Sequence, residues 1–205
     1  MSTFDSISPP LVLASGSPRR RQLLQEAGIE IEVIPAHTEE LKRAGETARE
    51  EIERLATEKA QAVARKLGTN PARLILGSDT GVVLGDDVLG KPRDAAHAVE
   101  LLQRLMNQTH AVITAVALVR SDTLSCNCFS VDTAVTFGDA PLDEIQRYVA
   151  TGEPMDKAGA YAIQGGGRRF ITDTCGSESN VIGLPMERTL EELQKLGISK
   201  EEPAS

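Results

Sequence analysis

The stretch of sequence that decides the fold is Leu11-Val12-Leu13-Ala14-Ser15-Gly16-Ser17-Pro18-Arg19-Arg20. Its apolar start, residues 11–14, predicts a short buried strand, and the small polar residues that follow predict a tight loop. Ser17 is a preferred helix N-cap and Pro18 a preferred first helical residue, so we expect a helix to begin at Pro18. The chain therefore enters its fold as a strand joined directly to a helix.

Farther along the chain, predicted strands and helices alternate before hairpins take over. Residues 29–34 alternate like a half-exposed strand, and Thr47 to Leu67 carries the apolar stripe of a long amphipathic helix. Leu74 to Leu76 predicts a strand that ends in the loop Gly77-Ser78-Asp79-Thr80-Gly81. The remaining predictions are a hairpin of 82–84 with 88–89, a helix over 94–106, β-rich stretches over 110–120 and 124–137, and helices over 141–151 and 185–196. This order predicts an α/β fold whose mixed sheet is flanked by helices, with two lobes and a central cleft.

Length and composition predict one globular domain. The chain has 205 residues, of which 40% are hydrophobic and 25% charged, and a chain of this size buries a sizeable core without metals or disulfides. We expect a single domain with two lobes over residues 1–205, with flexible tails at 1–10 and 200–205.

Charge and cysteine content argue against several partners and compartments. Lys and Arg number 22 against 30 Asp and Glu, and the resulting net charge of −8 disfavours binding to extended nucleic acid. No segment has the length of a membrane span, and the first residues lack a secretion signal. The three cysteines are an odd number, and Cys126 and Cys128 are poorly placed for a disulfide. We therefore expect a cytoplasmic protein, in which His97 and His110 are structural.

The loop from Ser15 to Arg20 is a candidate phosphate site. It brings hydroxyls, loop N–H groups, the positive end of a helix and two guanidinium groups together, and this combination suits a phosphate chain. An N-cap followed by a solvated basic turn is the alternative, and the local sequence leaves both open. The chain contains neither GxGxxG opening its first helix nor a GxxxxGK motif, so Rossmann and P-loop assignments fail.

Acidic candidates occur at Asp79 and at the pair Glu39 and Glu40. Asp79 follows an apolar strand and two small residues, where a carboxylate can hold Mg²⁺ or orient an attacking water. A turn Asp that bonds its own backbone is the alternative, and position alone favours it. Ligands collect at the carboxyl ends of strands in such sheets, where we expect Ser15 and Asp79. An acidic pair in a loop, taken alone, is more often simply solvated.

Two lysines are candidates for phosphate contact. Lys91 is held between Gly90 and Pro92, whereas Lys59 lies on the long helix beside its small residues. Most lysines face water. A lysine held in a loop is nevertheless the better phosphate ligand, so Lys91 outranks Lys59 on physical grounds.

The segment from Gly152 to Gly165 is rich in turn-forming residues but specific in its side chains, which is typical of a binding segment. The amide of Gln164 both donates and accepts, so it can pair with the ring N–H and carbonyl of a pyrimidine. The glycines at 165–167 either let the backbone pass close to a ligand or form a flexible turn.

Seven motifs in sequence order resemble the Maf family of nucleoside triphosphate pyrophosphatases. They are Ser15-Gly16-Ser17-Pro18-Arg19-Arg20, the Glu39-Glu40 loop, Glu58-Lys59-Ala60, Ser78-Asp79-Thr80, Gly90-Lys91-Pro92, Asp156-Lys157-Ala158-Gly159 through Gln164-Gly165, and Asn180-Val181-Ile182-Gly183-Leu184-Pro185. The match runs over nearly the whole chain. It departs from the family pattern at residues 106–109, which lack a Gly, and at Ser78, where Ala is usual and the extra hydroxyl is expected near the metal.

The resemblance implies a fold, an activity and a cofactor. The fold is an elongated, ITPase-like mixed sheet with a cleft between two lobes, and homodimers are frequent. The activity is cleavage of nucleoside triphosphates to monophosphate and pyrophosphate, dependent on Mg²⁺ or Mn²⁺. The segment from Asp156 to Gln164 resembles the branch of the family that acts on dTTP and UTP.

The resemblance also implies roles for single residues. Asp79 matches the catalytic acid/base, and Glu40 matches an acidic residue near the metal. Positions that help select the base are matched by Arg19, Thr80 and Gln164. Positions at the phosphates are matched by Ser15, Arg20, Lys59 and Lys91.

We therefore expect Asp79 and Glu40 to hold a divalent cation at the triphosphate while Asp79 deprotonates or orients a water that attacks the α-phosphorus. Cationic side chains then offset charge on the departing pyrophosphate. The alternative is a nucleotide-binding regulator without essential turnover, because the family has also been linked to restraint of septum formation and cell division.

Overall fold

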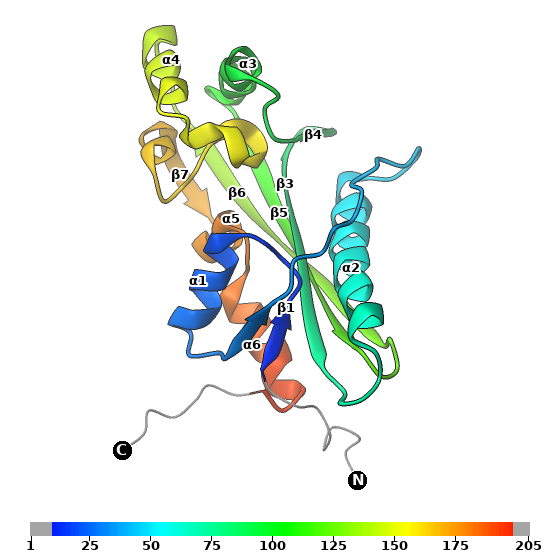
Figure 1. Ribbon diagram of the computed structural model, residues 1–205. Coiled ribbons are helices and arrows are strands. Elements are labelled where there is room, and N and C mark those ends of the chain that lie inside the picture. Colours follow the sequence, from blue (N-terminus) through cyan, green and yellow to red (C-terminus); the bar gives the residue numbers. More distant parts are fainter. Residues whose placement is uncertain (1–9, 199–205) are drawn as a thin grey trace, which may run out of the picture. The chain divides into compact units, whose positions relative to one another are not determined.

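Within residues 10–198, which a computed structural model describes, seven strands form one mixed sheet in the order β2-β1-β3-β5-β6-β7, with β4 paired to β3 (Figure 1). The strands are β1 (Leu11–Leu13), β2 (Ile31–Val33), β3 (Leu74–Leu84), β4 (Asp87–Leu89), β5 (Thr109–Arg120), β6 (Cys126–Phe137) and β7 (Ile171–Cys175). β1 runs parallel to β2 and β3, whereas β4 is antiparallel to β3 and β7 to β6. The predicted mixed sheet is confirmed. The predicted tails at 1–10 and 200–205 lie outside the described residues, apart from Pro10.

Helices flank this sheet, which confirms the predicted α/β class. They are α1 (Pro18–Glu26), α2 (Ala48–Leu67), α3 (Ala95–Leu105), α4 (Leu142–Ala150), α5 (Glu178–Ile182) and α6 (Met186–Lys195). Short 3₁₀ turns are η1 (Glu153–Asp156), η2 (Ala158–Ala160) and η3 (Gly166–Phe170). Among the helices of the described region, none combines the length and apolar character that crossing a membrane requires.

The chain divides into two compact units. The first combines Met1–Asp79 with Ala115–Ser130 and Gly183–Ser205, and the second combines Thr80–Thr114 with Val131–Ile182. The central cleft expected from the sequence stays a prediction.

The first two helices begin where the sequence predicts. At α1, Pro18 is the first residue, and the Ser17 hydroxyl accepts a hydrogen bond from the backbone N–H of Arg20 at 3.5 Å. At α2, the Thr47 side chain caps the backbone of Glu50, and the Glu50 carboxylate accepts from the Thr47 N–H in return. Both caps satisfy N–H groups that a helix start leaves without partners, so local sequence is enough to set these starts.

β3 corrects the predicted loop at residues 77–81. The strand runs without interruption from Leu74 to Leu84, so Asp79 lies inside a strand and not at its end. Gly77 suggests a turn in the sequence, but it allows a close approach of helix α2. A Cβ at Gly77 would lie 2.7 Å from the backbone nitrogen of Ala60 and 2.8 Å from its Cβ. The glycine is therefore a packing residue of the sheet.

Strand β1 ends at Leu13, whereas its neighbour β3 continues to Leu84. Its parallel register with β3 pairs Leu13 with Leu76. Continued for two residues, the register brings Ser15 opposite Ser78. Asp79 thus lies on β3 just beyond the point where β1 has ended. The carboxyl end of a strand is also where open α/β sheets bind their ligands.

Alternating strand residues of the first unit face different helices. α2 lies on one side of β1 and β3, and α1 and α6 lie on the other (Figure 1). Apolar residues on the α1 and α6 side form one buried cluster, which includes Leu11, Leu13, Leu24, Leu74, Leu76, Leu184 and Leu193. Gly77 faces α2, and the period of two along a strand directs Asp79 to that same side.

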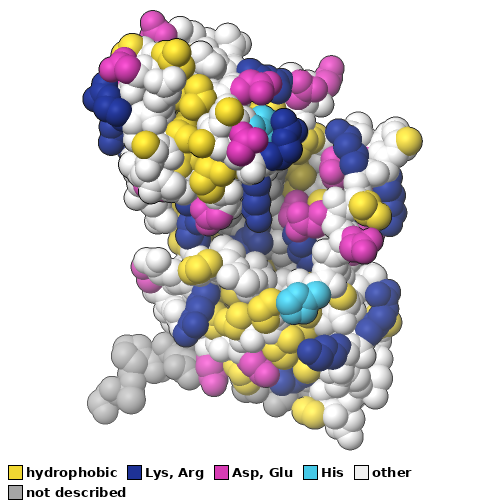
Figure 2. Space-filling view, turned by 45° about the horizontal axis from the view of Figure 1, so that its top comes forward, with side chains coloured by type: hydrophobic (Ala, Val, Ile, Leu, Met, Phe, Trp, Pro, Cys, Tyr) yellow, Lys and Arg dark blue, Asp and Glu magenta, His cyan; other side chains and the backbone are white. Residues whose placement is uncertain are grey.

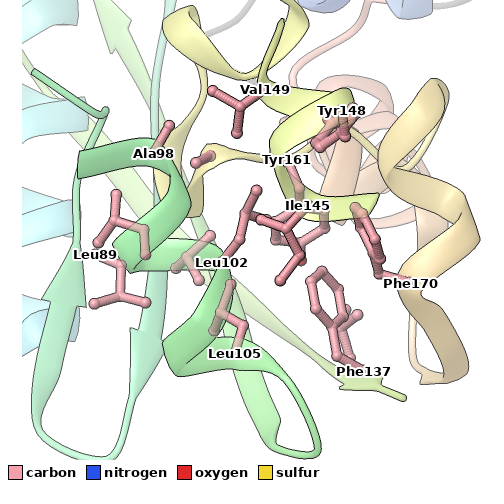
Figure 3. Close-up of a cluster of buried hydrophobic side chains, with 14 of the residues drawn as sticks. Leu89, Ala98, Leu102, Leu105, Phe137, Ile145, Tyr148, Val149, Tyr161 and Phe170 are labelled. Carbon is pink, nitrogen blue, oxygen red and sulfur yellow. The ribbon is translucent and has the colours of Figure 1, made fainter. Parts of the chain in front are cut away.

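The second unit has its own core, built around aromatic rings (Figure 3). Helices α3 and α4 pack there with Phe137, Tyr148, Tyr161 and Phe170. The Phe137 and Tyr161 rings meet edge to face with centroids 4.9 Å apart, and the Tyr148 and Phe170 rings do so at 5.4 Å. Such edge-to-face contacts add orientation to the hydrophobic packing.

His110 is buried in this aromatic core, as its predicted structural role requires. Its Nε2 lies 2.8 Å from the Tyr161 hydroxyl, and its ring packs edge to face against Phe137. Burial lowers the pKa of His110 from its ordinary 6.5 to about 4. The ring is therefore neutral in the folded protein near pH 7.

We expect His110 to make the protein less stable in mild acid. The unfolded chain binds a proton at this residue below pH 6.5, whereas the folded chain binds it only near pH 4. The contribution of neutral His110 to the free energy of unfolding is therefore complete above pH 6.5 and falls as the pH is lowered toward 4. The total loss is at most ~3 kcal/mol. Urea unfolding of the wild type and of His110→Gln measures it: the free energy of unfolding of the variant should depend less on pH between 4 and 6.5. Equal pH dependence of the two proteins would refute the assignment.

Candidate functional site

A cradle of three acceptors holds the Arg20 guanidinium in the first unit. Nη1 donates to the Ser15 hydroxyl at 3.1 Å and to the backbone carbonyl of Ser78 at 2.8 Å, and Nε donates to the carbonyl of Gly183 at 2.8 Å. These acceptors come from the loop after β1, from β3 and from the segment before α6. Three hydrogen bonds, two of them to distant segments, therefore fix the position of this cation at the end of β1.

Neighbouring charges act on Arg20 in opposite directions. Burial lowers the pKa of its guanidinium, the Asp79 carboxylate raises it, Arg19 lowers it and Glu40 raises it, with a net shift below the ordinary value. Arginine stays protonated even so. The site therefore holds a partly desolvated positive charge, and such a charge attracts an anion more strongly than one in bulk water.

The ammonium of Lys59 joins the two acidic candidates. Its Nζ lies 2.6 Å from an oxygen of Asp79 and 2.6 Å from an oxygen of Glu40. The side chains of Lys59 and Asp79 are 13% and 16% exposed, whereas that of Glu40 is 54% exposed. Glu40 is therefore part of an ion-pair network and not an isolated solvated charge. The phosphate role of Lys59 stays a prediction, because its ammonium contacts carboxylates here.

Ser78 serves the other side of the strand. Its side chain is fully buried, and its hydroxyl lies 3.4 Å from the carbonyl of Gly183, which also accepts from Arg20. The hydroxyl expected near the metal is thus directed toward Gly183 and away from the face that Asp79 shares with α2. It supports the Arg20 cradle.

In the second unit, Thr80 begins a chain of polar contacts. Its hydroxyl lies 3.0 Å from that of Thr114, which donates to the backbone carbonyl of Asn180 at 2.9 Å. The Asn180 amide is fully buried and donates to the carbonyl of Val112 and to the hydroxyl of Thr133. Thr80 is therefore supported by a buried polar network, and its role in base selection stays a prediction.

Two more predicted motifs meet in the second unit. The backbone N–H of Gly159 donates to the carbonyl of Gly90 at 3.1 Å, which ties the loop of Lys91 to the segment that leads to Gln164. Both Lys91 and Gln164 are exposed. The structure thus links these two segments and leaves both side chains open to a ligand.

Comparisons with known proteins identify the family of the chain. The family model described as "Maf-like protein" matches residues 10–196. The chain belongs to the Maf family. It is 47% identical over 193 residues to a protein of Anaeromyxobacter dehalogenans named dTTP/UTP pyrophosphatase, covering 93% of this chain and 96% of that protein. It is 50% identical over 183 residues to a Salmonella typhimurium protein of the same name, covering 88% and 90%.

The acidic residues of this Maf protein fit a divalent cation that is shared with substrate. Within residues 10–198, no group of three or more His, Cys, Asp or Glu side chains is arranged to hold a metal alone. Mg²⁺ commonly takes only one or two protein carboxylates and completes its shell with phosphate and water. Glu40 and Asp79 meet this requirement, because both already converge on one positive atom, the Nζ of Lys59. Metal binding by this pair stays a prediction.

Several contacts at the candidate site of this Maf protein cannot be predicted from its sequence. Two of the three acceptors around Arg20 are backbone carbonyls, for which the residue type carries no signal. Gly183 lies in the Asn180–Pro185 motif, so the resemblance marks the segment but not the contact. Thr114 lies within an apolar strand, and its polar contacts with Thr80 and with the carbonyl of Asn180 come from distant parts of the chain.

Proposed function

We propose that this protein hydrolyses dTTP and UTP between the α- and β-phosphates, giving the nucleoside monophosphate and pyrophosphate. The observation that carries the proposal is the convergence of Lys59, Glu40 and Asp79 at the end of β1, close enough to Arg20 for both carboxylates to affect its pKa. Two carboxylates with two cations suit a metal-bound polyphosphate. The names of the relatives supply the substrate.

Asp79 acts on the attacking water in this proposal. Its carboxylate orients the water and accepts its proton as the oxygen bonds to the α-phosphorus. The bond between the α-phosphorus and the bridging oxygen breaks, and that oxygen leaves with pyrophosphate. Arg20 offsets charge on the departing group, aided by Lys59 and by Lys91.

The metal, Mg²⁺ or Mn²⁺, would be held by Glu40 and Asp79 together with the phosphates, and when bound it neutralises phosphate charge and polarises the phosphoryl oxygens. Ser15 adds a hydroxyl at the phosphates. The Ser15 oxygen accepts a hydrogen bond from Arg20, so the proton of the Ser15 hydroxyl can still be donated to a phosphate oxygen.

Base selection falls to Arg19, Thr80 and Gln164. The Gln164 amide pairs with the carbonyl and N–H edge that uracil and thymine share. Its exposure and its place after the Asp156–Gly159 motif support this role.

The substrate is a free nucleotide and not extended nucleic acid. The net charge is −8, and acidic and basic side chains lie interspersed on the face that Figure 2 shows. Such a surface suits a small anion held by a few specific cations. A cytoplasmic location and a homodimer belong to the same proposal.

Release of pyrophosphate from a panel of nucleotides tests the proposal. Purified protein should release pyrophosphate from dTTP and UTP faster than from CTP, ATP or GTP in the presence of Mg²⁺. Chelation of the metal with EDTA should abolish release, and added Mg²⁺ or Mn²⁺ should restore it. Phosphate detection with and without added inorganic pyrophosphatase distinguishes pyrophosphate from directly released orthophosphate.

Two outcomes would overturn the proposal. Direct release of orthophosphate would mean cleavage at the γ-phosphate. Tight binding of dTTP or UTP without turnover under any metal condition would instead support the alternative class, a nucleotide-binding regulator.

A further inference from the structure

Two side chains of the second unit hold both ends of the short segment that carries Gln164. The Tyr148 hydroxyl accepts a hydrogen bond from the backbone N–H of Ala162 at 3.2 Å. The Glu153 carboxylate accepts one from the backbone N–H of Gly166 at 3.0 Å. Gln164 lies midway between these two bonded residues. We call Tyr148 and Glu153 the clamp.

The two members of the clamp bind each other. The Tyr148 hydroxyl donates to one Glu153 oxygen at 2.7 Å, while the other oxygen takes the Gly166 N–H. Each of these groups is therefore used twice, once within the clamp and once on the segment. Loss of either side chain would remove the contact at one end of the segment and the bond that supports the other clamp residue.

Three successive glycines follow Gln164 because the chain wraps tightly around the clamp. A Cβ at Gly165 would lie 2.6 Å from the Glu153 carboxyl carbon, one at Gly166 3.0 Å from the Tyr148 ring, and one at Gly167 2.9 Å from the Tyr148 hydroxyl. The glycines thus let the backbone approach the protein's own polar groups.

The clamp is anchored to the rest of the unit. Tyr148 is 2% exposed, and its ring packs among Ile145 and Phe170 (Figure 3). The Thr151 hydroxyl accepts from the Glu153 N–H at 3.2 Å, and the Lys157 ammonium donates to the Glu153 carbonyl at 2.6 Å. A rigid support of this kind can set the place of an exposed side chain on the segment above it.

Protonation states favour the clamp at neutral pH. Burial raises the pKa of Glu153, but hydrogen bonds from Tyr148, Gly166 and Gly167 outweigh it, so the pKa lies below its ordinary value. Burial and the bond to Glu153 raise the pKa of Tyr148 above its ordinary value. The clamp is thus a neutral phenol on a charged carboxylate, a strong type of hydrogen bond.

We propose that Tyr148 and Glu153 are positioning residues that hold Gln164 in place and thereby set the discrimination between bases. The inference rests on the proposed function, in which Gln164 reads the base. Neither clamp residue needs to touch the nucleotide. Their effect should therefore appear in the choice of base and not in the binding of phosphates.

The ratio of kcat/KM for UTP to that for CTP measures this discrimination, because cytosine lacks the ring N–H that Gln164 pairs with. Glu153→Gln and Tyr148→Phe should each lower the ratio about tenfold, as expected when a hydrogen bond to a charged group is lost. Gln164→Ala should lower it at least as far. Glu153→Gln added to Gln164→Ala should lower it no further, since the residue that the clamp positions is already gone.

Two controls separate positioning from a general loss of structure. Inhibition by inorganic tripolyphosphate, which has no base, should change less than twofold in the clamp variants. Glu100→Gln makes the same exchange at an exposed position on α3 and should leave the ratio unchanged. Hydrogen exchange at the Gly166 amide should be faster in Glu153→Gln than in the wild type.

The outcomes distinguish this inference from the function on which it rests. If Gln164→Ala keeps the wild-type ratio, base reading by Gln164 is wrong and the inference falls with it. If Gln164→Ala loses the ratio while both folded clamp variants keep it, only the inference falls. Should Glu153→Gln fail to fold, Tyr148→Phe, which removes a single oxygen, decides the question.

Discussion

We expect Asp79→Asn to lower kcat for UTP by ~10³-fold, which is within the range that removal of a general base costs. Asn keeps the shape of the side chain but cannot accept the proton of the attacking water. It also removes one of the two negative charges that converge on Lys59. Steady-state release of pyrophosphate under saturating UTP and Mg²⁺ measures the loss.

The fold should survive this change. The Asn oxygen can still accept from Lys59, and Glu40 still pairs with the same ammonium. Thermal unfolding should therefore remain cooperative and near the wild-type temperature. Asp86→Asn makes the same exchange in the exposed turn between β3 and β4 and should keep full activity. A kcat for Asp79→Asn within a few fold of the wild type would remove Asp79 from the reaction.

We expect the second large effect from Arg20→Ala, which should lower both stability and turnover. The change removes all three bonds of the cradle and leaves the carbonyls of Ser78 and Gly183 without this donor. Because charged hydrogen bonds and enclosed acceptors are involved, we expect a loss of ~3 kcal/mol in the free energy of unfolding. Turnover should fall ~10²-fold or more, because a preorganised cation at the phosphates is lost.

Arg20→Lys should rescue little of either effect, because one ammonium cannot reproduce the planar fork that reaches three acceptors. Arg21→Ala is the matched control. Arg21 follows directly in α1, is exposed, and should tolerate the change in both urea unfolding and turnover. Equal losses in Arg20→Ala and Arg21→Ala would mean that the cradle has no special role.

Local sequence predicts the elements whose ends carry their own signals. Ser17 with Pro18 sets the start of α1, and Thr47 with Glu50 sets the start of α2, because each cap is made within four residues. Such features depend little on the rest of the fold. For this reason the predicted helix starts agree closely with the structure.

The prediction of a loop at residues 77–81 is wrong because a contact with a distant helix decides the conformation there. Two glycines flank small polar residues there, which usually indicates a turn. The decisive contact is that of Gly77 with Ala60 on α2, seventeen positions earlier in the chain, and no local pattern contains it. The same limit applies to the glycines after Gln164, because the side chains that they pack against, Tyr148 and Glu153, lie earlier in the chain.

The candidate site divides in the same way. Its charged side chains can be predicted from the sequence, because the family motifs contain Arg20, Lys59 and Asp79. That Lys59 pairs Asp79 with Glu40 follows only from the packing of α2 on β3. The carbonyl acceptors of Arg20 and the clamp below Gln164 depend on contacts between distant segments and have no signature in residue type.

Hydrolysis of UTP in water enriched in ¹⁸O tests the attack at the α-phosphorus most directly. Mass spectrometry of the products locates the oxygen that the water supplies. We predict one ¹⁸O atom in the uridine monophosphate and none in the pyrophosphate. Label in the pyrophosphate, or labelled orthophosphate as the first product, would contradict the account.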